Sequence, residues 1–87
     1  MYRIIKTITM NTPSITIFEE MKSAAIAVWQ TYDNQYGYVT EKLERINGIT
    51  NVQDNAMVFY RMFDYENQAK MRERLSQESI NYINENR

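Results

Sequence analysis

The stretch from Ala56 to Leu75 reads AMVFYRMFDYENQAKMRERL, and its first half decides the predicted fold. Met57 to Phe63 is a run of apolar and aromatic residues that surrounds one arginine, Arg61. Aromatic and β-branched residues favour strands, and the run shows no polar face at helical spacing. Asp64 then supplies a good helix N-cap. The stretch therefore predicts a strand over 57–63 and, after it, a charged helix from Tyr65 to Leu75.

Two helices and one more strand are predicted outside this stretch. Tyr2 to Thr9 is rich in β-branched residues and predicts a strand that ends at the turn residues 11–14. Thr16 and Glu19 have capping-box spacing, so a helix is predicted from there to about Gly37. A last short helix is predicted over 78–84. The apolar stripe of the long helix comprises Phe18, Met21, Ala25, Val28, Trp29 and Tyr32.

Tyr38 to Ile46 fits two structures. Val39, Leu43 and Ile46 keep helical spacing, whereas Gly37 and the turn signal at 47–48 bracket a strand equally well. We interpret the segment as a strand, because the run over 57–63 needs a neighbour with which to pair. The helical alternative stays open.

Composition limits what kind of protein this is. The chain has 87 residues, 44% of them hydrophobic, with a formal net charge of −1, which suits one compact domain over 1–87. It has neither Cys nor His, so thiolate metal sites, disulfides and the commonest acid–base and nucleophilic catalysts are excluded. No segment has the apolar core of a signal peptide or approaches a membrane span. We expect a cytoplasmic protein with no cofactor.

The predicted order is strand, helix, strand, strand, helix. This order fits a ferredoxin-like α+β fold, β-α-β-β-α, with helices on one face of an antiparallel sheet and the fourth strand absent. Without the fourth strand, the strand over 2–9 would be an open edge.

The chain resembles the dimeric α+β barrel superfamily, which includes antibiotic-biosynthesis-monooxygenase-like proteins. The resemblance rests on the opening strand, on Gly37-Tyr38-Val39, and on the strand over 58–63 that runs through Asp64 into the helix at 65–69. It implies a ferredoxin-like barrel. The opening residues MYRIIKTITMNTPSITIF also look like the start of small uncharacterised proteins of T4-like bacteriophages, which implies a phage origin, in host cytoplasm or virion, and no transferable activity.

A protein-binding surface is the function that this predicted fold favours. Both faces of the strand over 57–63 are apolar, and one layer of helices covers only one of them. The uncovered face, or the open edge, would then dock a protein, either a second copy of this chain or a host or virion protein, whether the chain is an assembly component or an inhibitor of a host factor. The predicted partner-binding residues are Tyr2, Ile5, Glu41, Met57, Phe59, Arg61 and Phe63, with Glu41 as a pairing partner for Arg61.

The sequence suggests three other interpretations. A cofactor-independent monooxygenase is what the resemblance implies, with Trp29, Tyr32, Phe59 and Tyr60 around its pocket. RNA binding of the RNA-recognition-motif type fits the strand order, but the net charge of −1 supplies no phosphate-binding surface. The residues from Asp33 to Gly37 resemble a calcium loop only superficially, since they lack alternating oxygen ligands and a distant bidentate Glu, and they are interpreted as a polar helix end.

Overall fold

The computed structural model describes residues 14–86, apart from the side chains of residues 53–55. Every regular element in this range is helical. The α-helices are α2 (Ile15–Trp29), α3 (Tyr38–Gly48), α4 (Val52–Arg61), α5 (Tyr65–Arg72) and α6 (Gln77–Asn86), and a 3-10 turn, η1 (Gln35–Gly37), precedes α3. The α+β fold predicted from the sequence is therefore wrong for the described residues, which form a small helical bundle.

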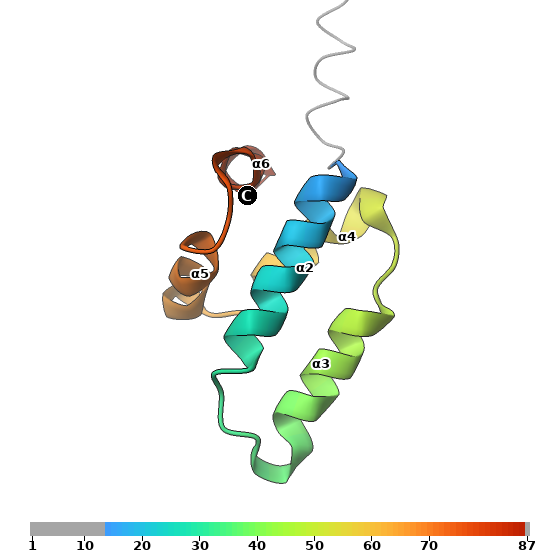
Figure 1. Cartoon of the computed structure of the whole chain (residues 1–87), viewed down its shortest axis with the longest axis vertical. Coiled ribbons are helices and arrows are strands. Elements are labelled where there is room, and N and C mark those ends of the chain that lie inside the picture. Colours follow the sequence, from blue (N-terminus) through green and yellow to red (C-terminus); the bar gives the residue numbers. More distant parts are fainter. Residues whose placement is uncertain (1–13, 87) are drawn as a thin grey trace, which may run out of the picture.

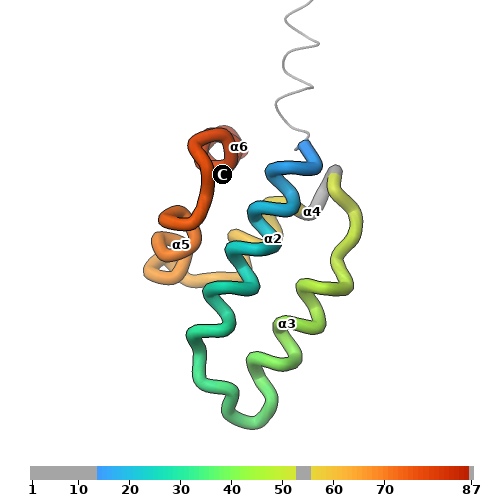
Figure 2. The backbone as a smooth tube through the Cα atoms, viewed as in Figure 1, coloured from blue at the N-terminus to red at the C-terminus, as the bar shows by residue number. Residues whose placement is uncertain are grey.

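Helix α2 is the centre of the bundle and contacts each of the other four α-helices, α4 most extensively. Figure 1 shows α3 on one side of α2 and α5 and α6 on the other. The tube in Figure 2 shows the chain reversing after α2, so that α3 runs back alongside it. The N-cap of α2 is Ser14 rather than the predicted Thr16, which lies inside the helix. The Ser14 side-chain oxygen accepts a hydrogen bond from Ile17 N at 3.1 Å.

The predicted apolar stripe of α2 is confirmed, whereas its predicted end is not. The residues of the stripe up to Trp29 are buried, and Tyr32 is partly buried. The helix ends at Trp29 rather than near Gly37. Thr31 donates through Oγ1 to Val28 O at 2.6 Å and through its backbone N–H to the same oxygen. These bonds satisfy a carbonyl of the last turn of α2, and the helix ends there.

The run predicted as a strand over 57–63 lies in α4 and the residues that follow it. Ala56, Phe59, Tyr60 and Phe63 follow one another at helical steps and are all buried, while Arg61 is exposed on the other side. Phe59 packs edge-on against Phe18 of α2, with ring centroids 5.3 Å apart. The run that looked like a strand with two apolar faces is thus one wide apolar face of a helix, and Arg61 lies outside that face.

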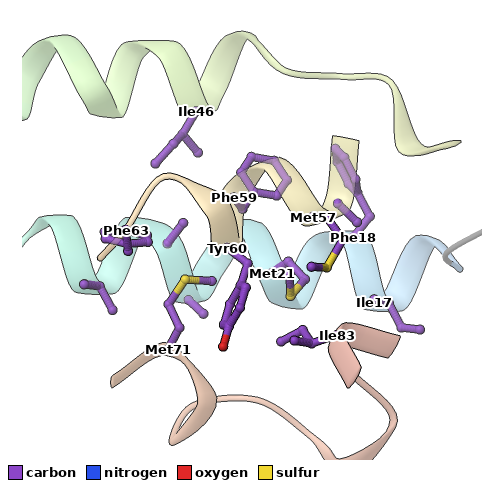
Figure 3. Close-up of a cluster of buried hydrophobic side chains, with 14 of the residues drawn as sticks. Ile17, Phe18, Met21, Ile46, Met57, Phe59, Tyr60, Phe63, Met71 and Ile83 are labelled. Atoms are coloured by element: carbon purple, nitrogen blue, oxygen red, sulfur yellow. The ribbon is translucent and has the colours of Figure 1, made fainter. Parts of the chain in front are cut away.

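Tyr38 to Ile46 is helical as well, so the helical alternative was the right one. Val39 and Ile46 are buried and Leu43 is partly buried. Figure 3 shows Ile46 pointing from α3 into the core, and α3 packs directly on α2. Once 57–63 is helical, this segment has no strand with which to pair, and its own helical spacing decides its structure.

Both predicted C-terminal helices are present, although α5 ends at Arg72 rather than at Leu75. Asp64 caps α5 by accepting from Asn67 N at 3.0 Å, and α6 carries the buried residues Tyr82 and Ile83. In Figure 3, Met71 and Ile83 lie across the core from Ile46. Ser76 lies between the two helices, where the helical backbone is interrupted. Its N–H donates to Glu20 Oε1 at 2.9 Å, which holds this junction against α2.

One further prediction is overturned as a result, and one lies outside the described residues. The resemblance to the dimeric α+β barrel superfamily is wrong, because such a barrel needs a sheet and residues 14–86 contain none. The strand predicted over 2–9 lies outside the described residues.

Candidate protein-binding surface

The turn between α2 and α3 is held in one conformation by the side chain of Asn34. Its Oδ1 accepts from the backbone N–H groups of Val39 at 3.0 Å and Thr40 at 3.2 Å, and its Nδ2 donates to Thr40 Oγ1 at 2.9 Å. Two N–H groups that the start of α3 would otherwise leave unsatisfied are thereby bonded. The start of α3 is thus capped by a side chain that precedes it, and these bonds close a loop around the 3-10 turn η1.

Two successive residues of this loop have left-handed backbone conformations. Tyr36 has φ 58° and Gly37 has φ 74°, and no other described residue has a positive φ. Glycine adopts this region without a steric penalty, but a tyrosine does not. The Tyr36 side chain is completely exposed. The fold therefore holds a large aromatic side chain in solvent at a backbone position that disfavours it.

Tyr36 lines a pocket of about 410 Å³, which we call the tyrosine–acid pocket. Its lining is Asp33, Gln35, Tyr36, Tyr38 and Glu41. Both carboxylate-bearing residues are exposed, and Tyr38 is about half exposed. None of the described residues that line it is basic. The pocket thus combines two aromatic rings with two negatively charged carboxylates.

A buried aromatic cluster supports the pocket from below. Trp29 is buried at the end of α2 and packs edge-on against Tyr38, with centroids 5.5 Å apart, and against Phe63 at 5.0 Å. Lys42 Nζ lies 5.4 Å from the centroid of Tyr38 and 6.0 Å from that of Trp29. Such separations are those of cation–π contacts. The Tyr38 ring is therefore fixed between the core and a cation of the same chain.

Negative charge extends from the pocket toward the start of α5. Burial raises the pKa of Tyr32, and the nearby carboxylates of Asp64 and Glu66 raise it further. A hydrogen bond from Asn67 N holds the pKa of Asp64 below its usual value. Tyr32 also packs on Trp29 with centroids 4.5 Å apart. Tyr32 therefore lies near two carboxylates at the start of α5, and Lys70 acts on Asp64 in the same region.

Two other hollows lie elsewhere on the described surface. One of about 560 Å³ follows the first turns of α2 and is lined by Ile15, Thr16, Glu19, Glu20, Ser23, Ala24 and Arg74. A smaller one, of about 260 Å³, lies between the end of α2 and α5 and is mainly polar. Neither presents an aromatic side chain as exposed as Tyr36.

The structure distributes the predicted partner-binding residues over different environments. Met57, Phe59 and Phe63 are buried in the core, and the sheet face on which they were predicted is absent from the described range. Arg61 is exposed and donates from Nη2 to Asn86 O at 3.2 Å, which ties the end of α4 to α6. Glu41 alone among these described residues lines the tyrosine–acid pocket.

Tyr2 and Ile5, the remaining two predicted partner-binding residues, lie outside the described residues. Asp33, Tyr36 and Tyr38 were not predicted as site residues, because residues 33–37 were interpreted as the end of a long helix. The sequence did contain one signal, the dipeptide Tyr36-Gly37. An aromatic residue next to a glycine within a polar segment indicates a turn that leaves the aromatic ring exposed.

The described residues include no group of three His, Cys, Asp or Glu side chains that could hold a metal ion. Within the same residues, no helix is both long and apolar enough to cross a membrane. Trp29, Phe59 and Tyr60, which the monooxygenase interpretation placed around a pocket, are core residues, and the Tyr60 hydroxyl accepts from Arg72. That interpretation and the RNA-recognition-motif interpretation both assumed a sheet.

Comparisons with protein-family models, with curated proteins and with solved structures found no match to this chain. The likeness of the opening residues to phage proteins finds no support there and carries no further argument.

Proposed function

We propose that this chain is a small non-catalytic protein-binding module that binds its partner through the tyrosine–acid pocket. The observation that carries the proposal is Tyr36, a completely exposed aromatic residue at φ 58°. A left-handed backbone costs a residue other than glycine roughly 1–2 kcal/mol, and such outliers gather at binding and active sites. Tyrosine is also among the residues most enriched in protein interfaces.

The construction of the loop supports the same proposal. Asn34 satisfies the start of α3, and Gly37 takes the second left-handed position, so Tyr36 is presented by a rigid support. A backbone that is already ordered loses less conformational entropy when a partner binds. The Trp29 cluster beneath Tyr38 fixes the second ring of the pocket in the same way.

Site-specific photo-crosslinking tests the proposal. A benzophenone amino acid at position 36, in cells that make the protein, is expected to give a discrete crosslinked protein species. The control is the same probe at Tyr65, which is also an exposed tyrosine but is the first residue of α5 and does not line the pocket. Equal capture from positions 36 and 65, or none from position 36, would remove the proposed function.

A substitution then links the captured species to the pocket. Tyr36→Asn, with the probe moved to Gln35, is expected to lose the crosslink while the circular dichroism spectrum stays helical. Tyr65→Asn is expected to keep it. A crosslink that survives Tyr36→Asn would show that the partner binds next to Tyr36 without using its ring.

A further inference from the structure

The tyrosine–acid pocket has the chemistry of a site for a planar cation. Asp33 and Glu41 supply carboxylate oxygens, Tyr36 and Tyr38 supply ring faces, and Gln35 supplies an amide. Aromatic faces attract cations, and carboxylates bind guanidinium through paired hydrogen bonds. A volume of about 410 Å³ falls within the range usual for sites that hold a small molecule or a side chain.

The Tyr38 ring already attracts a cation within the chain. Lys42 Nζ lies 5.4 Å from its centroid, and Lys42 follows Glu41 on α3. The electrostatic environment of this ring is therefore favourable to positive charge, independently of the carboxylates. Lys42 also contacts the ring of Trp29, so it lies on the side of the buried cluster. Its charge offsets only part of the charge of Asp33 and Glu41.

The position at the start of α3 works against a bound cation, since a helix N-terminus carries about half a positive charge. Two features reduce this effect. The N–H groups of Val39 and Thr40 already bond to Asn34 Oδ1, and Glu41 in the first turn faces the helix charge. Two carboxylates against the Lys42 ammonium and about half a charge from the helix leave about half a negative charge, which still attracts a cation.

We propose that the pocket binds an arginine side chain in a basic segment of the partner protein, an inference that rests on the proposed function. Guanidinium stacks flat on aromatic rings and matches two carboxylates with a rigid set of donors, whereas the lysine ammonium is a more strongly hydrated point charge. The ring of Tyr36, held away from the bundle, covers one face of the guanidinium. Asp33 and Glu41 accept its N–H groups.

A titration of the full chain with a short acetylated peptide that carries one arginine tests this inference. In ¹H–¹⁵N spectra, the peptide is expected to shift the resonances of residues 33–41. A matched peptide with citrulline, which has the same shape without the charge, is expected not to. Asp33→Asn with Glu41→Gln is expected to weaken binding by about tenfold or more. The control pair, Glu44→Gln with Glu73→Gln, removes two exposed carboxylates outside the pocket and is expected to change little.

Lys42 gives a second, opposite readout. If it competes for the same aromatic surface, Lys42→Gln should strengthen binding of the arginine peptide by about two- to fivefold. Weaker binding in this variant would overturn the cation-binding role of the Tyr38 ring.

Three results would overturn the inference while leaving the proposed function intact, provided that the crosslink at position 36 persists. They are equal binding of the citrulline peptide, no loss in the double carboxylate variant, and shifts confined to residues outside 33–41. Self-association that increases with concentration and shifts residues 33–41 would identify the occupant as a second copy of this chain rather than a basic segment. Loss of the crosslink at position 36 would instead refute the proposed function.

Discussion

Replacing Tyr36 by Asn should make the protein more stable. The Tyr36 side chain is completely exposed, so the substitution removes no buried area. Its backbone at φ 58° costs a tyrosine roughly 1–2 kcal/mol, and asparagine visits this region more readily because its short side chain bonds locally. Relief of about half of that penalty predicts a gain of about 0.5–1 kcal/mol in the free energy of unfolding.

Urea denaturation measures this gain. The transition can be followed by circular dichroism and by the fluorescence of Trp29, the one tryptophan of the chain. For a domain of this size, about 0.5–1 kcal/mol corresponds to a rise in Tm of about 2–8 °C. The midpoint should move while the slope of the transition stays constant.

Tyr65→Asn is the matched control for this prediction. Tyr65 is also largely exposed, but it begins α5 and has no positive φ, so its free energy of unfolding should change by less than about 0.5 kcal/mol. A loss of more than about 1 kcal/mol in Tyr36→Asn would refute the reasoning, because the tyrosine ring would then be stabilising the fold rather than being presented by it.

Three other perturbations probe the support of the surface and the core. The pKa of Glu20 is lowered from 4.5, first by the hydrogen bond from Ser76 N, so its stabilising contribution is complete above about pH 4.5 and disappears as the pH falls through the folded pKa. Glu20→Gln keeps an acceptor oxygen but loses the charge at a largely solvated site, so it should lower the free energy of unfolding by about 0.5–1 kcal/mol at pH 7 and flatten its acid dependence; an unchanged acid dependence would contradict this. Asn34→Ala should cost about 0.5–2 kcal/mol in thermal unfolding and Asn34→Asp less, since Asp keeps the acceptor; equal losses would show that the Nδ2 bond dominates. Trp29 Nε1 is buried with no hydrogen-bond partner among the described residues, so Trp29→Phe removes a donor whose burial costs about 1–3 kcal/mol. Trp29→Phe should therefore destabilise the fold much less than Trp29→Ala does, as measured by circular dichroism. Equal losses in the two variants would contradict the unpaired donor.

The sequence predicted those helices whose start and stripe were both written locally. Asp64 marks the start of α5, Ser76 marks its separation from α6, and the stripe of α2 was read correctly from Phe18 to Trp29. For α5 and α6 the capping residue lies next to the periodic residues, so a short window contains the whole signal. For α2 only the stripe was predicted correctly, because the cap was assigned to Thr16 and the structure has it at Ser14. The end of α2 was missed because Tyr32, Tyr36 and Tyr38 continue the aromatic composition beyond the point where Thr31 closes the last turn.

The fold class failed at one choice, the run over 57–63. Met57, Phe59 and Phe63 are apolar whether the run is a strand or a helix, so hydrophobicity alone does not separate the two structures. Arg61 separates them. In a helix it faces solvent at the side opposite the stripe of Phe59 and Phe63, and there it reaches Asn86 O; in a strand it shares a face with both. The strand interpretation then forced the neighbouring segment, 38–46, to become a strand as well.

The candidate surface was not predicted for a different reason. At most described positions local preference and fold agree: Ser14 and Asp64 cap helices, and Gly37 takes a left-handed position. At Tyr36 they disagree, because the residue suits neither the backbone conformation nor full exposure to water. A natural sequence that is consistent elsewhere departs from local preference mainly at functional or strained sites. The φ angle that reveals the disagreement is set by the Asn34 cap and by the packing of α3 on α2, so the sequence names Tyr36 but only the fold shows its conformation. The stability of Tyr36→Asn and its binding should therefore move in opposite directions, a combination that a tyrosine kept for the fold does not give.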